Sequence, residues 1–185
     1  MRLKEVLLPL TREIVSNLNV GDEVRITGDV ITMRDAALNR LSALLQKGEK
    51  LPFELLGEVI FHAGPTPPLK GRPCGAIGPT TSSRMDGFLG MLFEMGVLAT
   101  IGKGPRSSEV CDLHARYGTV YFACVGGVGA LYGGMVKSVE KIAWDDLGPE
   151  AIAKILIEGL PAVVAIDSKG RDYLREEWTH FRHLK

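Results

Sequence analysis

Three segments of the sequence each place a cationic side chain where a strand ends and a helix is expected to begin. They are TMRD at residues 32–35, GPTTSSRMD at residues 78–86 and GKG at residues 102–104. The cations in these segments are Arg34, Arg84 and Lys103. The chemistry that such segments could support is the electrostatic binding of a small anion.

The physical basis is the charge distribution of a helix start. Unpaired N–H groups and a partial positive charge make a cation there unfavourable by about 0.3–1 kcal/mol. A bound anion reverses this, because N–H groups, dipole and cation then attract it together. Arg34 and Arg84 add planar forks that match a carboxylate, and the glycines beside Lys103 allow close backbone approach. The segments therefore predict one anion site; solvated arginines and an ordinary Ser/Thr cap are the alternatives.

Strands and helices alternate along the predicted chain, so the expected class is α/β with a mixed or mostly parallel sheet. Apolar and β-branched runs predict strands at residues 24–31, 57–62, 97–101, 120–125, 136–143 and 162–166, and an edge strand or arm at 3–10. Spacing and caps predict helices at residues 35–47, 84–95, 107–117 and 149–158. Thr32 and Asp35 form a capping-box-like start for the first helix, and Ser107 or Ser108 caps the third.

Composition sets the broad class. Lys plus Arg and Asp plus Glu both total 22, so the zero formal net charge gives no indication of nucleic-acid binding. No window reaches the roughly 18 uninterrupted apolar residues of a membrane span, and charges interrupt the N-terminal apolar residues, unlike a signal peptide. Three cysteines, an odd number, argue against a secreted disulfide framework. We therefore expect a cytoplasmic protein with no membrane or nucleic-acid partner.

Other catalytic and metal-binding motifs are incomplete. The GKG segment is not a P-loop, because Val97 stands where the first glycine is required and another glycine follows Lys103. The glycine-rich residues 126–134 lack the G-x-G-x-x-G spacing, so a tight turn or close packing is expected there. The cysteines lack C-x-x-C spacing and the histidines lack H-E-x-x-H, so packing is the expected role of Cys111 and Cys124.

The cationic segments together resemble a known family. GPTTSSRMD, with TxRD upstream, HAGP at residues 62–65 between and GKG downstream, is similar to the C-terminal domain of class I iron–sulfur hydro-lyases. This family includes class I fumarase and L(+)-tartrate dehydratase, and in many prokaryotes the domain is a separate β subunit. The resemblance runs from about residue 20 to residue 170, and GPTTSxRMD is its specific motif.

The resemblance implies a fold and a domain organisation. The fold is a swivelling β/β/α domain, an α/β class with a mixed central sheet flanked by helices. The chain is expected to be a single domain over residues 1–185. Outside the range of the resemblance, the residues themselves predict an arm or edge strand at residues 1–20 and a helical C-terminal tail at residues 173–185.

The resemblance also implies roles for the site residues. Arg34, Arg84 and Lys103 resemble ligands of the substrate carboxylates, and Thr80 resembles the residue proposed to remove the C3 proton. A threonine hydroxyl is a poor base, so hydrogen bonding to the substrate is the simpler alternative for Thr80. Asp86 could orient Arg84 or fix the helix start. The supporting positions are Thr32, Asp35, Gly78, Thr81, Asp86, Gly102 and Gly104.

Cofactor and partner follow from the same resemblance. The family holds a [4Fe–4S] cluster through three cysteines of a partner domain, which implies a cysteine-bearing α subunit, a hetero-oligomer and no metal bound by this chain alone. The open iron would take the hydroxyl of malate or tartrate as a Lewis acid.

The residues and the resemblance are compatible with three functions. Reversible hydration of fumarate to (S)-malate is the first, L(+)-tartrate dehydration the second, and a non-catalytic anion-binding or assembly module the third. One position departs from the family, which often continues RDxAH: Leu38 replaces that histidine, and its helical spacing predicts core packing.

Overall fold

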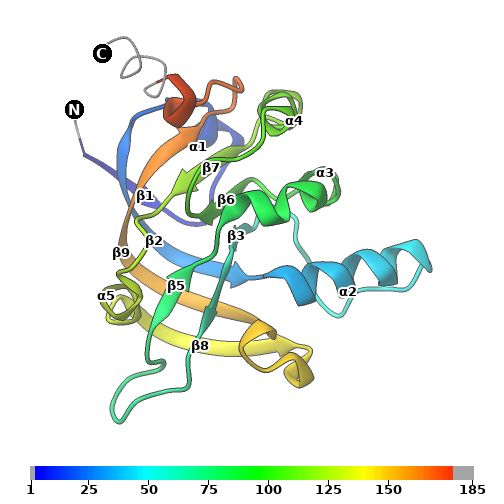
Figure 1. Ribbon diagram of the computed structural model, residues 1–185, viewed down its shortest axis with the longest axis vertical. Coiled ribbons are helices and arrows are strands. Elements are labelled where there is room, and N and C mark those ends of the chain that lie inside the picture. The colour runs from blue at the N-terminus through cyan, green and yellow to red at the C-terminus, as the bar shows by residue number, and fades with distance from the viewer. Residues whose placement is uncertain (1–2, 177–185) are drawn as a thin grey trace.

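The computed structural model describes residues 3–176, and its centre is a seven-stranded mixed sheet that closes on itself (Figure 1). Its strand order is β1-β2-β3-β6-β7-β9-β8, and β9 also pairs with β2, so that β2, β3, β6, β7 and β9 form a barrel-like ring. The strands are β1 (Lys4–Leu7), β2 (Glu23–Thr32), β3 (Val59–Phe61), β6 (Ala99–Gly102), β7 (Val120–Ala123), β8 (Val136–Ala143) and β9 (Ile152–Ile166). The predicted α/β class with a mixed central sheet flanked by helices is confirmed.

Alternating side chains give the ring two packed faces. In β3, Val59 and Phe61 belong to one core cluster and Ile60 to a second, and in β7 Phe122 and Tyr121 divide in the same way. This is the period of two expected of a strand that is buried on both sides. The first cluster consists mainly of strand and loop residues, with Val15 of α1 and Tyr132 of α5, whereas the second includes the buried apolar residues of α2, α3 and α4.

The helices lie mainly against one side of the ring. Figure 1 shows α2, α3 and α4 together on that side, and their buried residues join the second core cluster. The helical segments are α1 (Arg12–Ser16), α2 (Asp35–Gln46), the 3₁₀ helix η1 (Ser82–Phe88), α3 (Leu89–Glu94), α4 (Glu109–Tyr117), α5 (Gly129–Gly133) and the 3₁₀ helix η2 (Asp145–Glu150). None of the helices within residues 3–176 is long and apolar enough to cross a membrane.

The parallel strands explain why the three cationic segments meet. β2, β3, β6 and β7 run parallel, so their carboxyl ends share one edge of the sheet. Segment 32–35 leaves β2 at this edge, and segment 102–104 leaves β6 there. A hairpin of β4 (Ala63–Pro65) and β5 (Ile77–Pro79) follows β3 and returns segment 78–86 to the same edge. Ligands of α/β sheets usually bind at this edge.

One predicted helix, at residues 149–158, is wrong. η2 ends at Glu150, and residues 152–166 form the long strand β9, which pairs with β2 on one side and β8 on the other. Ala153, Ile155 and Ile157 alternate into the first core cluster. The spacing of the apolar residues in this run fits both a helix and a strand. Hydrogen-bonded pairing with β2 and β8 on its two sides stabilises the strand.

Other boundaries differ less from the predictions. The helix predicted at residues 84–95 begins two residues earlier as η1 and continues as α3, and the glycine-rich residues 126–134 contain the short helix α5. α1 was not predicted. Among the described strands β1 pairs with β2 alone and forms an edge of the sheet. Residues 173–176 are helical, and the rest of the predicted C-terminal tail lies outside the described residues.

The start of α2 also differs from the predicted capping box. Thr32 ends β2, and its hydroxyl accepts from the backbone N–H of Ala153 at 3.1 Å, which links it to β9 rather than to the helix. Arg34 occupies the N-cap position without a side-chain cap. The first-turn N–H of Ala36 instead donates to Glu150 Oε2 at 2.8 Å.

Candidate active site

Backbone hydrogen bonds lock the second and third cationic segments together. The N–H of Thr80 donates to the carbonyl of His62 at 2.6 Å, and the N–H of Lys103 donates to the carbonyl of Thr80 at 3.1 Å. The N–H of Ser82 donates to the carbonyl of Lys103 at 2.9 Å, so that Thr81 and Lys103 form a parallel bridge. Thr80 and Lys103 are thus placed side by side by the backbone itself.

Gly102 is required by this close approach. A Cβ added there would lie 2.0 Å from Ser82 Oγ and 3.3 Å from the carbonyl oxygen of Thr80. Gly104 has a φ of +74°, a conformation that glycine adopts readily. The glycines beside Lys103 therefore serve the packing and turning of the loop, and the close approach of a ligand to them stays a prediction.

Arg84 connects the second segment with the first. Its Nε and Nη2 donate to the two carboxylate oxygens of Asp35 at 3.1 and 2.8 Å. Asp35 is the first residue of α2, and the Arg84 side chain remains 53% exposed. Asp35 therefore orients Arg84, the role that the sequence suggested for Asp86.

Arg34 lies against a carboxylate, that of Glu150, which the spacing of residues along the chain did not predict. Its Nη2 is 3.6 Å from Glu150 Oε1, and its buried Nε has no hydrogen-bond partner among residues 3–176. Its Nη1 lies 3.2 Å from the position that a Cβ on Gly64 would take, so the guanidinium packs beside the β4–β5 hairpin. Because Glu150 also caps α2, this helix start already holds an internal anion.

Lys103 is the cation without an internal counter-charge. It forms no ion pair within residues 3–176. Its Nζ lies 3.6 Å from the position of an added Cβ on Gly126, so the side chain extends over the glycine-rich loop. On this loop Gly129 packs on Gly78, where an added Cβ would lie 3.4 Å from Gly78 Cα.

Thr80 is mostly buried, with 8% of its surface exposed. Its hydroxyl has no hydrogen bond to a basic side chain within the described part of the chain. The neighbouring His62 is fully buried, and desolvation, with a contribution from Arg106, lowers the pKa of its imidazole to about 3. Its Nδ1 lies 3.0 Å from the carbonyl of Met33, so the ring donates there as a neutral tautomer. We therefore find no activating base for Thr80 in residues 3–176.

A buried arginine that the sequence did not single out lies beneath these loops. The Nη1 of Arg106 donates to Asp86 Oδ1 at 2.6 Å and to the carbonyl of Ser82 at 3.0 Å. The backbone N–H of Ser107 donates to the other oxygen of Asp86 at 2.8 Å. Asp86 therefore balances the charge of Arg106 and accepts a backbone hydrogen bond from the loop that leads into α4. A charged residue is usually exposed, so spacing alone offered no signal for Arg106.

Leu38, Cys111 and Cys124, for which the sequence predicted packing roles, all pack in or against the core clusters. Leu38 is fully buried in the second core cluster, which confirms its predicted packing. Cys111 packs against the second cluster and Cys124 lies in the first, as predicted. Burial raises the pKa of the Cys124 thiol to about 12, which opposes thiolate formation. Within residues 3–176 there is no group of three or more His, Cys, Asp or Glu side chains that could hold a metal.

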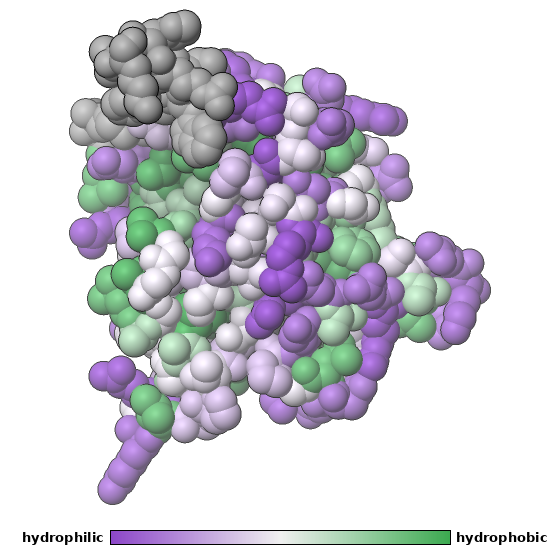
Figure 2. Space-filling model, in the orientation of Figure 1, coloured by the Kyte–Doolittle hydropathy of each residue, from purple (hydrophilic) through white to green (hydrophobic). Residues whose placement is uncertain are grey.

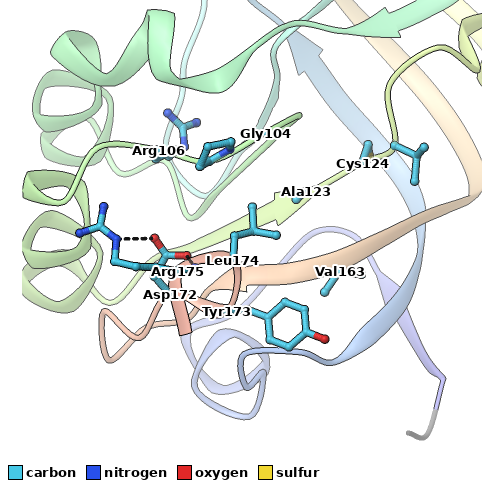
Figure 3. A pocket seen from close by; sticks show the side chains of 11 residues that line it. Gly104, Arg106, Ala123, Cys124, Val163, Asp172, Tyr173, Leu174 and Arg175 are labelled. Carbon is cyan, nitrogen blue, oxygen red and sulfur yellow. Dashed lines mark hydrogen bonds and ion pairs between the residues drawn. The ribbon is translucent and has the colours of Figure 1, made fainter. Parts of the chain in front are cut away.

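A cavity borders the GKG loop at Gly104. It measures about 580 Å³, and its lining includes Pro105, Val163 and Leu174. Figure 3 shows Arg106 at its edge, with the guanidinium turned away from Leu174 and Tyr173. None of the predicted substrate-contact residues lines it. Figure 2 shows polar and apolar residues interspersed over the face seen in Figure 1.

The fold and the site define a class of domain, an α/β barrel-like sheet whose parallel strands end at a cluster of cations. The model of the family described as Fumarase C-terminus matches residues 1–177, and the chain belongs to this family. The resemblance inferred from the motif is thereby confirmed.

Two relatives are separate subunits. The chain is 37% identical over 173 residues to the putative L(+)-tartrate dehydratase subunit beta of Methanocaldococcus jannaschii, which covers 90% of this chain and 89% of that protein. It is 31% identical over 183 residues to the L(+)-tartrate dehydratase subunit beta of Escherichia coli, covering 94% and 88%.

Other relatives are longer. The chain is 35% identical over 176 residues to the anaerobic class I fumarate hydratase of Escherichia coli, which covers 94% of this chain. It spans only 31% of the length of that protein.

Proposed function

We propose that this chain is the β subunit of a two-subunit iron–sulfur hydro-lyase that interconverts fumarate and (S)-malate. In this proposal the chain supplies the ligands of the substrate carboxylates. The observation that carries it is the joining of three cationic segments at one sheet edge by the Arg84–Asp35 pair and the Thr80–Lys103 backbone bonds. Membership of the Fumarase C-terminus family supports it.

Arg84 retains a fork for a ligand. Asp35 uses the Nε edge of the guanidinium, and within the described residues both N–H groups of Nη1 and one of Nη2 stay without a partner. Such an end-on fork matches a carboxylate in two hydrogen bonds. Because Lys103 has no carboxylate partner in residues 3–176, it offers a second point of attachment for a diacid.

These cations suit the reaction. Removal of a proton next to a carboxylate builds enolate-like charge on that carboxylate, and preorganised cations stabilise this charge most strongly in the transition state. For Thr80 we propose a hydrogen bond to the substrate. Its burial and the lack of a basic partner for its hydroxyl in residues 3–176 support this role over that of a base.

The [4Fe–4S] cluster belongs, in this proposal, to a cysteine-bearing α subunit. The described residues of this chain do not fit a cluster, because burial raises the pKa of the Cys74, Cys111 and Cys124 thiols and they form no metal-binding group. When bound by the partner, the cluster would supply a Lewis acid for the substrate hydroxyl.

Dehydration of L(+)-tartrate is the second candidate. It is favoured by the full-length match to subunits of that name, 37% identical over 89% of the relative from Methanocaldococcus jannaschii. Both substrates are four-carbon diacids, so the carboxylate ligands suit either of them.

The test is co-expression with a candidate α subunit, followed by purification without oxygen. Fumarate hydration and tartrate dehydration are then assayed side by side, with each subunit alone as control. We expect activity only when both subunits and the cluster are present. Full activity of this chain alone and without iron would contradict the proposal, and anion binding without turnover by the complex would favour a non-catalytic module.

A further inference from the structure

Arg106 is the most completely buried charge beneath the proposed site. Its side chain has no exposed surface, and its Nη2 donates to the Thr100 hydroxyl at 3.0 Å while Nη1 bonds to the carbonyl of Ser82 and to Asp86. One guanidinium thus links β6, η1 and the loop that leads from Lys103 to α4.

Tyr121, on β7, contacts both Arg106 and the loop that carries Lys103. The guanidinium carbon of Arg106 lies 4.5 Å from the centroid of the Tyr121 ring, and the Tyr121 hydroxyl donates to the carbonyl of Gly104 at 2.8 Å. The loop that carries Lys103 is therefore held at Gly104 from one side and through Arg106 and Ser107 from the other.

A gain in folding stability alone does not explain why the Arg106–Asp86 ion pair is buried. A buried ion pair is often no more stabilising than well-packed apolar side chains, because removing two charges from water is costly. A planar fork with fixed donor directions does, however, define the relative position of the groups that it joins. Here those groups are the segments that carry Arg84 and Lys103.

We infer that Arg106, held by Asp86, is a positioning residue that sets the spacing between Arg84 and Lys103. The inference rests on the proposed function, because it assigns these two cations to one dicarboxylate. Asp86 balances the buried charge at 2.6 Å, so the pair supports the site without competing for the substrate anion. Two carboxylates thereby have different roles: Asp35 orients Arg84, and Asp86 anchors the loops through Arg106 and the Ser107 backbone.

The first test is a double-mutant cycle in the active complex, with R106K, R84A and the double variant. Lysine keeps the charge but loses the fork, so we expect R106K to lower kcat/KM roughly 100-fold, as expected for a misplaced binding group. In the R84A background the same change should cost much less, because the effects of coupled groups are not additive. Equal costs in both backgrounds would overturn the inference.

R40K is the matched control. Arg40 also holds an aspartate, Asp146, through two nitrogens at 2.8 and 2.6 Å and lies over the ring of Trp144, but this pair joins α2 to η2 and includes no residue of β6, η1 or the Lys103 loop. We expect less than about a twofold change in kcat/KM for R40K, since loss of an exposed pair is usually of little consequence. A loss like that of R106K would also overturn the inference.

The second test needs no activity and so separates this inference from the proposed function. Amide hydrogen exchange of the isolated chain is compared for wild type, R106K and the isosteric D86N. We expect faster exchange confined to residues 79–88 and 101–108, because only these segments lose their anchor. Uniform acceleration, or no acceleration, in D86N would contradict positioning even if R106K failed to fold. An inactive wild-type complex with this local pattern would instead count against the proposed function alone.

Discussion

At the scale of single residues, the site depends on how each arginine shares its donors. Asp35 takes only one edge of Arg84, whereas Glu150 lies beside Arg34 and also accepts the N–H of Ala36. Arg34 is therefore already paired with a carboxylate of the chain itself, that of Glu150. Arg84 keeps a fork that Asp35 does not use, and Lys103 has no carboxylate partner within residues 3–176, so these two cations should dominate substrate binding.

Replacement of Arg84 by alanine tests this directly. We expect R84A to lower kcat/KM by roughly 10²–10³ in the active complex, the usual effect of removing one donor to developing charge. The thermal midpoint should change little, because the side chain is half exposed. K137A on β8 is the control and should retain activity. Near-wild-type turnover of R84A would refute its assignment.

Replacement of Glu150 by glutamine tests its role as the cap of α2. The amide keeps the shape but removes the negative charge from the helix start, so we expect a loss of about 0.3–1 kcal/mol in the free energy of unfolding. Urea titration measures it. E158Q, at an exposed pair with Lys137, should be neutral. Equal stabilities of E150Q and wild type would show that the cap contributes nothing.

At the scale of elements, the contact between β6 and η1 is the critical one. Lys103 follows β6, Ser82 begins η1, and Gly102 leaves no room between them for a side chain. The short distance between these elements is what places two substrate-contact segments in one site.

We expect G102A to displace this contact. The added Cβ would lie 2.0 Å from Ser82 Oγ and 3.3 Å from the carbonyl oxygen of Thr80, so the Ser82 hydroxyl must rotate and the backbone contact must loosen slightly. The free energy of unfolding should fall by about 1 kcal/mol, the lower end of the range for overpacked sites. Activity should fall with it, because Lys103 moves. G90A in α3 is the control, since an added Cβ there meets nothing within 4 Å. Unchanged melting of G102A would contradict the packing described.

At the scale of the whole molecule, burial of histidine makes stability depend on pH. His62 and His114 are both buried, and desolvation, with a contribution from Arg106, lowers the pKa of each imidazole from 6.5 to about 3. Below pH 6.5 the unfolded chain binds protons that the folded chain does not. The folded state should therefore lose stability as the pH falls from about 6.5 towards 3.

The expected slope is up to about 1.4 kcal/mol per pH unit for each histidine, on top of the contribution of the carboxylates. Urea unfolding between pH 7.5 and pH 5 measures it, and H114Q should reduce the slope by the share of one residue. Histidine NMR signals of the folded chain should show no titration of His62 or His114 above pH 5. Titration near pH 6.5 would contradict their burial as neutral rings.

Much of the fold was predictable from local pattern. β-branched runs predicted β2, β3, β6, β7 and β8, and helical spacing predicted α2, because these signals lie within a few residues of one another. β9 was mistaken in part for a helix, since Ala153, Ile155 and Ile157 show their strand period only once β2 and β8 lie on either side.

The sequence by itself determined the motif and the three cationic segments, and it placed each segment after a strand, although α4 begins only at Glu109, well beyond Lys103. Only the tertiary structure decided which carboxylate meets which arginine: Asp35 reaches Arg84 across 49 positions, and Asp86 meets the buried Arg106. The reason is physical. Caps, turns and periodicity act between near neighbours along the chain, whereas an ion pair depends on which sheet edge brings two distant segments within hydrogen-bonding distance.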